Sequence, residues 1–206
     1  YFSATKIKWI LDNVKKSKKL LKTNNLLFGT IDSFLIWKLT KGKKHLTEAT
    51  NASRTMLYNI DNKIWDEELL KIFKIPKIIL PDIKNSMSDF GMAKINNLSI
   101  PIQGVAGDQQ AALFGQGCFD AGTSKCTYGT GLFYLFNTGD KRNDSNNGLL
   151  TTLVADKKGK PLYAIEGSVF VGGAVIQWIR DELELINNAS ETEDIALSID
   201  STDGVY

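Results

Sequence analysis

The sequence predicts an α/β protein built in two parts. Residues 1–116 alternate amphipathic helical segments with short extended segments and turns. Residues 122–206 are richer in β-strand patterns, in which a hairpin, a second pair of strands and a helix follow one another. These assignments rest on the spacing of apolar residues, which differs between helices and strands. The change of pattern near Gly122 therefore predicts that a new domain begins there, and no internal repeat is visible.

Composition narrows the class of protein. The 206 residues are 43% hydrophobic and 23% charged, which excludes a disordered, collagen-like or disulfide-built chain. No apolar run reaches the roughly 18 residues of a membrane span, and the N-terminus lacks a signal-peptide core. We therefore expect a cytoplasmic protein without stable membrane insertion. The chain begins inside a motif and ends just after a turn, so we also expect an internal fragment of a longer protein.

Charges and metal-binding side chains give little functional signal. Seven lysines lie within the first 22 residues, but no nucleic-acid-binding motif accompanies them, so we interpret them as a solvated helix face. His45 is the single histidine, and Cys118 and Cys126 have no second cysteine pair. These residues make no zinc set, and we expect no nucleic-acid partner and two free thiols.

Four segments precede residue 60. Residues 4–21 carry apolar side chains at helical spacing and predict one amphipathic helix. Residues 26–28 predict a short strand, and Thr30 is placed to cap a helix that continues to residue 39. Residues 45–60 are expected to be irregular or extended.

The next segments lead to a candidate site. Asp66 is expected to cap a short helix over residues 67–73. Residues 100–105 predict a buried strand that runs into Gly107 and Asp108, and residues 109–116 predict the start of a helix. In the second part, residues 125–128 and 132–137 predict a hairpin around Gly129-Thr130-Gly131. Two further strands, at 149–154 and 162–165, are joined by a polar turn at 156–160, and a helix follows from residue 172 to about 185.

Three positions could carry chemistry. Asp108 lies where an extended segment meets a helix N-terminus, which favours a negative charge, so it could accept a proton or hold a metal-bound water; it could equally only cap the helix. Gly129-Thr130-Gly131 could bring backbone N–H groups and a hydroxyl to a phosphate, or be an ordinary hairpin turn. Gly172-Gly173 opens a helix and suits either a phosphate or close packing against a sheet.

Several segments resemble, in the same order, the motifs of the FGGY carbohydrate kinases. The match runs through residues 1–13, 28–32, 50–57, 107–116, 128–131, 147–152 and 166–170, and so covers essentially the whole chain. Within the family, Thr-Asn-Ala-Ser-Arg-Thr at residues 50–55 and Gly-Asp-Gln-Gln at residues 107–110 are specific to the members that act on glycerol. The resemblance implies the two-domain actin/hexokinase/Hsp70-like (ribonuclease H-like) fold, only partly covered here. Residues 1–116 would be the end of the first domain and residues 122–206 the start of the second.

The resemblance also implies an activity and the residues that carry it. The activity is ATP-dependent phosphorylation of glycerol to glycerol 3-phosphate, with the substrates in a cleft. Asp108 matches the catalytic base, and the glycerol contacts match Tyr1, Asp108, Gln109 and Phe133. Nucleotide contacts match Thr130, Gly173 and Gln177. This fits phosphoryl transfer, in which positioning and charge stabilisation do most of the work.

Parts of the family pattern are missing. The phosphate hairpin with the acid used for Mg²⁺ would precede Tyr1, and the adenine-side glycine loop would follow Tyr206. The stretch that binds fructose 1,6-bisphosphate in bacterial members is short here, at residues 94–99, and has no arginine, so the resemblance does not extend to that inhibitor site. The alternatives are a kinase for another polyol or pentulose and a non-catalytic nucleotide-binding module. A homo-oligomer is possible, and the isolated chain is expected to be poorly folded or inactive.

Overall fold

The computed structural model describes residues 2–156 and 161–204, and the chain divides into two compact units. Unit 1 comprises Tyr1–Lys125 and Leu135–Glu166, and unit 2 comprises Cys126–Tyr134 and Gly167–Tyr206. This division follows spatial contacts and crosses three strands of one sheet, so each unit holds part of those strands. A domain boundary near residue 122, drawn along the chain, stays a prediction.

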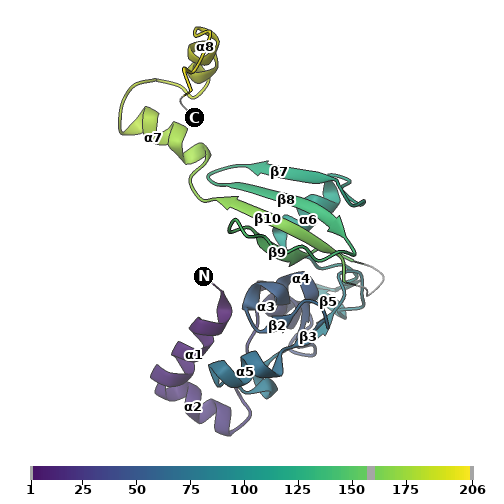
Figure 1. Cartoon of the computed structure of the whole chain (residues 1–206). Coiled ribbons are helices and arrows are strands. Elements are labelled where there is room, and N and C mark those ends of the chain that lie inside the picture. The colour runs from purple at the N-terminus through teal and green to yellow at the C-terminus, as the bar shows by residue number, and fades with distance from the viewer. Residues whose placement is uncertain (1, 157–160, 205–206) are drawn as a thin grey trace. The chain divides into compact units, whose positions relative to one another are not determined.

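The N-terminal helix predicted over residues 4–21 is interrupted. α1 (Ser3–Asn13) and α2 (Lys15–Lys22) meet at Val14, whose φ of −93° and ψ of 104° are extended (Figure 1). The hydroxyl of Ser17 donates to the carbonyls of Ile10 and Val14 at 3.1 and 2.7 Å, which satisfies acceptors that the end of α1 leaves open. The single helix predicted here is therefore two helices with a break at Val14.

The segment after α2 is not the strand we predicted. Residues 26–28 have no strand partner along their length; instead the Phe28 N–H donates to the Ile79 carbonyl at 2.7 Å. α3 (Ile31–Leu39) begins after Thr30 as expected, although Thr30 directs its hydroxyl to Asp32 and not to a helix N–H. β1 (Leu46–Glu48) then pairs in parallel with β4 (Asp82–Lys84).

Short elements follow β1. In the stretch expected to be irregular or extended, the structure has two helical turns, α4 (Ala49–Ala52) and the 3₁₀ turn η1 (Ser53–Thr55), before the strand β2 (Tyr58–Asn59). β2 pairs antiparallel with β3 (Ile64–Trp65). α5 (Glu67–Phe73) confirms the predicted capped helix, because the carboxylate of Asp66 accepts from the N–H groups of Glu68 and Leu69, both at 3.0 Å. A second 3₁₀ turn, η2, covers Lys77–Ile79.

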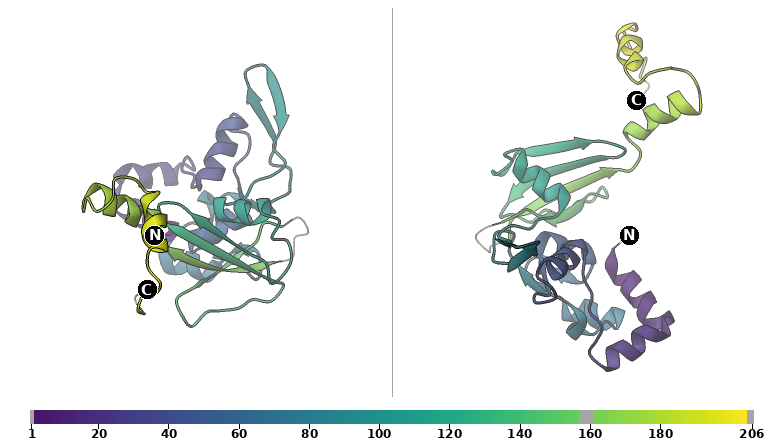
Figure 2. Two further views of the ribbon diagram at one scale, coloured as in Figure 1. Left: turned by 90° about the horizontal axis from the view of Figure 1, so that it is seen from above. Right: turned by 180° about the vertical axis from the view of Figure 1, so that it is seen from behind.

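The buried strand predicted over residues 100–105 is wrong. β5 (Met92–Ile95) and β6 (Leu98–Pro101) form an exposed antiparallel hairpin, which extends away from the helices of unit 1 (Figure 2). Asn96 lies at φ 53°, a left-handed conformation that asparagine tolerates in two-residue turns. The turn signal at Asn96-Asn97 thus outweighs the apolar run, and residues 102–107 reach Asp108 without regular structure.

A four-stranded sheet confirms the predicted hairpin and the second strand pair. β7 (Ser124–Tyr128), β8 (Leu132–Gly139), β9 (Leu150–Leu153) and β10 (Tyr163–Val169) lie in the order β7-β8-β10-β9. β9 and β10 are antiparallel, with Leu153 opposite Tyr163. Most of the polar turn predicted between them, residues 157–160, lies outside the described residues. α6 (Asp108–Gly115) packs against this sheet through Leu113, which shares a buried cluster with Leu135 and Ala164 (Figure 1).

Unit 2 ends in two short helices. α7 (Gly173–Asp181) begins at the predicted glycine pair but stops four residues before the predicted end, and Glu184 lies at φ 51°. α8 (Glu191–Leu197) follows, and neither helix contains a buried residue. Trp178 and Leu197 are exposed to 52% and 77%, so these helices have an apolar surface without a covering layer in the described chain. Among the described residues, no helix is long and apolar enough to cross a membrane.

The largest core lies in unit 1. It joins α1 to the segments between β1 and η2 through buried side chains that include Ile7, Leu57, Trp65 and Ile79. Leu153 and Tyr163 extend the same cluster to β9 and β10. This core fixes the segment that carries Thr50 relative to the strands beside α6.

Candidate active site

Asp108 and Gln109 are the first two residues of α6. Asp108 is exposed and Gln109 is half-buried. The Gln109 side-chain amide donates from Nε2 to Oδ2 of Asp108 at 3.2 Å. The N-cap residue of α6 is Gly107, and no side chain accepts a capping hydrogen bond from the first N–H groups of the helix. The capping interpretation of Asp108 is therefore wrong, and its carboxylate remains able to accept a proton.

The backbone before α6 is held by a buried carboxylate. The Gly107 N–H donates to the hydroxyl of Thr50 at 2.8 Å, and that hydroxyl donates to Oε2 of Glu48 at 2.6 Å. Glu48 is fully buried and also accepts from the hydroxyl of Ser86 at 2.6 Å and from both nitrogens of Asn51 at 3.1 Å. A buried charge is tolerable when hydrogen bonds satisfy it in this way.

This carboxylate also acts on titratable neighbours. Burial raises the pKa of Tyr58 well above its usual range, and the charge of Glu48 adds to the effect. Burial lowers the pKa of Lys63, whereas the carboxylates of Asp156 and Glu48 oppose that change. Tyr58 and Lys63 therefore both lie where burial disfavours the charged form of the side chain.

Gly107 lies close to the side chain of Gln110. A Cβ built there would lie 2.6 Å from Oε1 of Gln110 and 3.4 Å from Oγ1 of Thr50. The φ of Gly107 is −63°, which any residue adopts, so a larger residue here would have to displace the end of the Gln110 side chain. Gln110 is buried and donates from Nε2 to the hydroxyl of Thr152 at 3.2 Å, which ties α6 to β9.

A bidentate ion pair closes the same region of unit 1. Arg54 donates to the two carboxylate oxygens of Glu166 at 2.9 and 3.1 Å, and Glu166 is buried. The guanidinium carbon of Arg54 also lies 5.3 Å from the ring centre of Phe2. Arg54 and Glu166 therefore join η1 to β10, and Arg54 also contacts Phe2. The predicted glycerol contact Tyr1 lies outside the described residues.

The second candidate site, in unit 2, consists of backbone. The N–H groups of Gly172 and Gly173 donate to the carbonyls of Thr130 and Gly129 at 2.7 and 2.8 Å. A Cβ at Gly173 would lie 2.7 Å from the Gly129 carbonyl oxygen, and one at Gly172 would lie 2.6 Å from Leu132. Close packing of α7 against the hairpin turn therefore explains both glycines.

The other predicted residues of unit 2 lie around this joint. Thr130, in the turn, is exposed, and Gln177 is exposed one turn along α7 from Gly173. Phe133 is half-buried in β8, three residues after Thr130. The structure thus groups Asp108 with Gln109 in unit 1, and Thr130 with Gly173 in unit 2.

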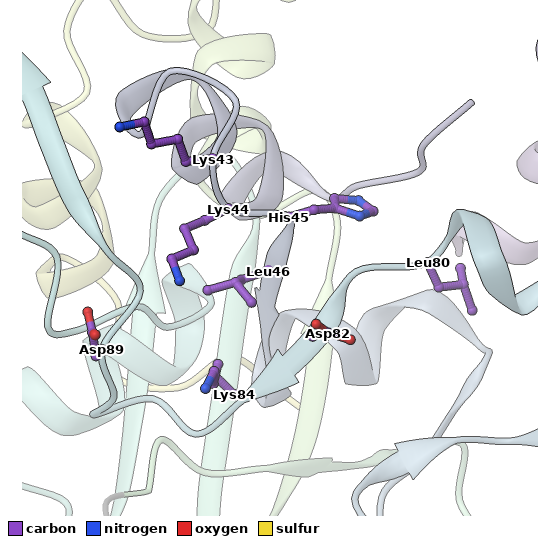
Figure 3. A pocket seen from close by; sticks show the side chains of 8 residues that line it. All are labelled: Lys43, Lys44, His45, Leu46, Leu80, Asp82, Lys84 and Asp89. Atoms are coloured by element: carbon purple, nitrogen blue, oxygen red, sulfur yellow. The ribbon is translucent and has the colours of Figure 1, made fainter. Parts of the chain in front are cut away.

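A pocket elsewhere on unit 1 contains none of these residues. It is a cavity of about 450 Å³ beside the parallel pair β1 and β4 (Figure 3). Its lining is mainly charged, and comprises Lys43, Lys44, His45, Leu46, Leu80, Asp82, Lys84 and Asp89. Within residues 2–156 and 161–204, no group of three or more His, Cys, Asp or Glu side chains could hold a metal ion.

Family models match nearly the whole chain. The N-terminal domain model of the FGGY family of carbohydrate kinases matches residues 1–115, and the C-terminal domain model matches residues 124–203. The chain belongs to the FGGY family of carbohydrate kinases. It covers part of the actin/hexokinase-like two-domain fold of this family, which confirms the predicted fold class.

Individual FGGY relatives include glycerol kinases. A glycerol kinase of Clostridium botulinum (strain Langeland) is 59% identical and one of Fusobacterium nucleatum is 57% identical; each match covers 100% of this chain and 42% of the relative. The crystal structure of Plasmodium falciparum glycerol kinase with ADP is 43% identical, with a TM-score of 0.91 over 98% of this chain and 41% of that one. The chain thus spans about two fifths of the length of these relatives.

Sequence reasoning missed the buried polar residues behind the candidate site. Glu48, Thr50, Gln110 and Lys125 are all buried, yet none stands out by residue type. Thr50 and Gln110 do lie inside two of the family motifs quoted above, and this was the available signal. Glu48 and Lys125 carry charge in otherwise apolar or β-rich segments, which is a weaker signal.

Proposed function

We propose that this chain is the central part of an ATP-dependent glycerol kinase. One observation carries the proposal: Asp108 and Gln109 lie side by side at the start of α6, in a chain 59% identical to a Clostridium botulinum glycerol kinase. Because the chain spans two fifths of its relatives, the activity would require the remaining segments as well. A cytoplasmic location and a homo-oligomeric assembly stay predictions.

The proposed reaction transfers the γ-phosphoryl group of ATP to a terminal hydroxyl of glycerol. The hydroxyl oxygen forms a bond to the γ-phosphorus as the bond to the β-phosphate oxygen breaks, and the hydroxyl proton passes to the carboxylate of Asp108. Asp108 suits this role because it is exposed and accepts a hydrogen bond from Gln109 alone within the described chain. An aligned carboxylate suffices, because the transition state is loose and positioning dominates.

Other residues would bind the two substrates. By family resemblance, Gln109 would bind a glycerol hydroxyl, and Tyr1 and Phe133 would cover its carbon atoms. Thr130, Gly173 and Gln177 would contact the nucleotide; the packed turn and helix backbone around Gly173 offers a rigid support for it. We assign no step to Mg²⁺ here, since the described residues contain no group of three or more His, Cys, Asp or Glu side chains that could hold a metal ion.

The test is Asp108→Asn in the full-length product of the gene that encodes these residues. We expect kcat for glycerol to fall about 10²- to 10⁴-fold, the usual contribution of a general base. The fold should persist, because the Asp108 side chain is exposed. Normal turnover by the variant would remove the base assignment, and faster turnover of xylulose or gluconate than of glycerol by the wild-type protein would overturn the substrate.

A further inference from the structure

Lys125 is a buried cation directed at the candidate substrate residue Gln109. It is the second residue of β7 and only 2% exposed. Its ammonium nitrogen donates to Oε1 of Gln109, 16 residues earlier in the chain. Desolvating an ammonium group costs free energy, whereas a methionine of similar volume would bury at no such cost. A specific hydrogen-bonding role would account for the lysine.

The chemistry of the three groups fixes one orientation of the Gln109 amide. A lysine ammonium can only donate, so it selects the amide oxygen. An ionised aspartate can only accept, so Asp108 selects the amide nitrogen, with Nε2 3.2 Å from Oδ2. The reversed amide would place like partners against each other at both ends. Lys125 and Asp108 therefore favour the same orientation of the Gln109 amide, each through a different atom of it.

We infer that Lys125 is a positioning residue that sets the Gln109 amide for substrate recognition. This inference rests on the proposed function of Asp108 and Gln109. With its oxygen held by Lys125, Gln109 presents only N–H groups next to the carboxylate. The pair then recognises two neighbouring hydroxyls of a polyol, one donating to Asp108 and the next accepting from Gln109.

The first experiment is Lys125→Met in the full-length gene product. We expect KM for glycerol to rise about 10-fold, as for the loss of one well-placed hydrogen bond, while KM for ATP stays unchanged. A merely structural role would lower the melting temperature without this selective rise. Equal changes in both KM values, or no change in KM for glycerol, would overturn the inference.

A double-mutant comparison separates the contact with Gln109 from the other contacts of Lys125. In a Gln109→Ala background, Lys125→Met should produce no further rise in KM for glycerol, because there is no amide left to orient. The same 10-fold rise in both backgrounds would show that Lys125 acts elsewhere. If Lys125→Met does not fold, Lys125→Gln serves the same comparison, because a glutamine amide can offer Gln109 either a donor or an acceptor and so no longer selects one amide orientation.

A structural measurement keeps this inference separate from the proposed function. Absence of glycerol phosphorylation by the wild-type protein would overturn the proposed function, and KM for glycerol could then not be measured. Crystal structures of the wild-type and Lys125→Met proteins would still decide the positioning role. We expect the Gln109 side chain to change rotamer or lose order in the variant, and an unchanged Gln109 contact with Asp108 would overturn the inference.

Discussion

The two candidate sites are held in place by different kinds of interaction. In unit 1, the segment that carries Asp108 is fixed by side chains: Glu48 acts through Thr50, and Lys125 acts through Gln109. In unit 2, the turn that carries Thr130 is fixed to Gly173 by backbone hydrogen bonds. The contacts that hold Asp108 and Gln109 therefore depend on the chemistry of side chains, whereas the joint at Gly173 depends on the absence of a side chain.

The largest effect is expected where a charge loses its partner in unit 1. Arg54→Met leaves the carboxylate of Glu166 buried without its bidentate donor. We expect the free energy of unfolding to fall by about 3 kcal/mol, the low end for breaking a buried pair, because Arg54 is itself 26% exposed. Urea unfolding of the full-length protein measures this loss.

Arg54→Lys is the matched control for that prediction. Lysine keeps the charge but loses the two-pronged geometry, so its loss of stability should be smaller than that of the methionine variant. Indistinguishable stability of the wild-type and Arg54→Met proteins would contradict the view that side-chain chemistry holds this region.

An intermediate effect is expected from added volume in unit 2. Gly173→Ala places a Cβ 2.7 Å from the Gly129 carbonyl oxygen, so the turn and α7 must separate. We expect a loss of about 1–3 kcal/mol in stability, typical of overpacking, and a rise in KM for ATP with little change in KM for glycerol. Differential unfolding and steady-state kinetics measure the two effects.

Gly104→Ala is the control for added volume. A Cβ at Gly104 meets no atom within 4 Å, so this substitution should leave stability and KM for ATP nearly unchanged. If Gly173→Ala behaves like Gly104→Ala, the backbone joint of unit 2 does not depend on close approach.

The smallest effect concerns the carboxylate of Asp66, which caps α5 in unit 1. The N–H groups of Leu69 and Glu68 and the amide of Asn59 lower the pKa of Asp66 below 3.8, with the Leu69 N–H as the largest cause. Because the folded-state pKa is lower than the unfolded one, Asp66 stabilises the protein above pH 3.8 and loses this effect as the pH falls through the folded value. Asp66→Ala should therefore be slightly less stable at neutral pH.

Thermal unfolding at several pH values tests the cap. The difference in melting temperature between the wild-type and Asp66→Ala proteins should shrink as the pH drops below 3.8. A difference that is independent of pH would mean that packing, and not the carboxylate charge, is what the substitution removes.

The elements predicted from the sequence are those specified by neighbouring residues. Asp66 caps α5 through N–H groups two and three residues away, and the turn at residues 129–131 closes between adjacent strands. The break at Val14 was not predicted, because Val14 continues the helical spacing of the apolar residues before it. The strand predicted at residues 100–105 failed because Ile100 pairs with Ala93 in an exposed hairpin.

The residues of the candidate site also differ in whether neighbouring residues or distant ones specify them. Asp108 and Gln109 were found because they stand together in a motif at the start of a helix. Glu48 and Lys125 were not found, because each reaches its partner through space; Ser86 lies 38 residues from Glu48 and Gln109 lies 16 residues from Lys125. Residue type and local spacing do not predict contacts between residues so far apart in the sequence.

The Arg54–Glu166 pair has a consequence for synthesis of the protein. Its members are 112 residues apart in the chain. At the roughly 5–20 residues per second of translation, Arg54 leaves the ribosome some 6–20 seconds before its partner. During that interval Arg54, in the Thr-Asn-Ala-Ser-Arg-Thr motif, has not yet formed its bidentate contact with Glu166. Completion of this region therefore follows translation of β10, and a pause in translation before residue 166 would prolong the exposure of the nascent chain to chaperones and proteases.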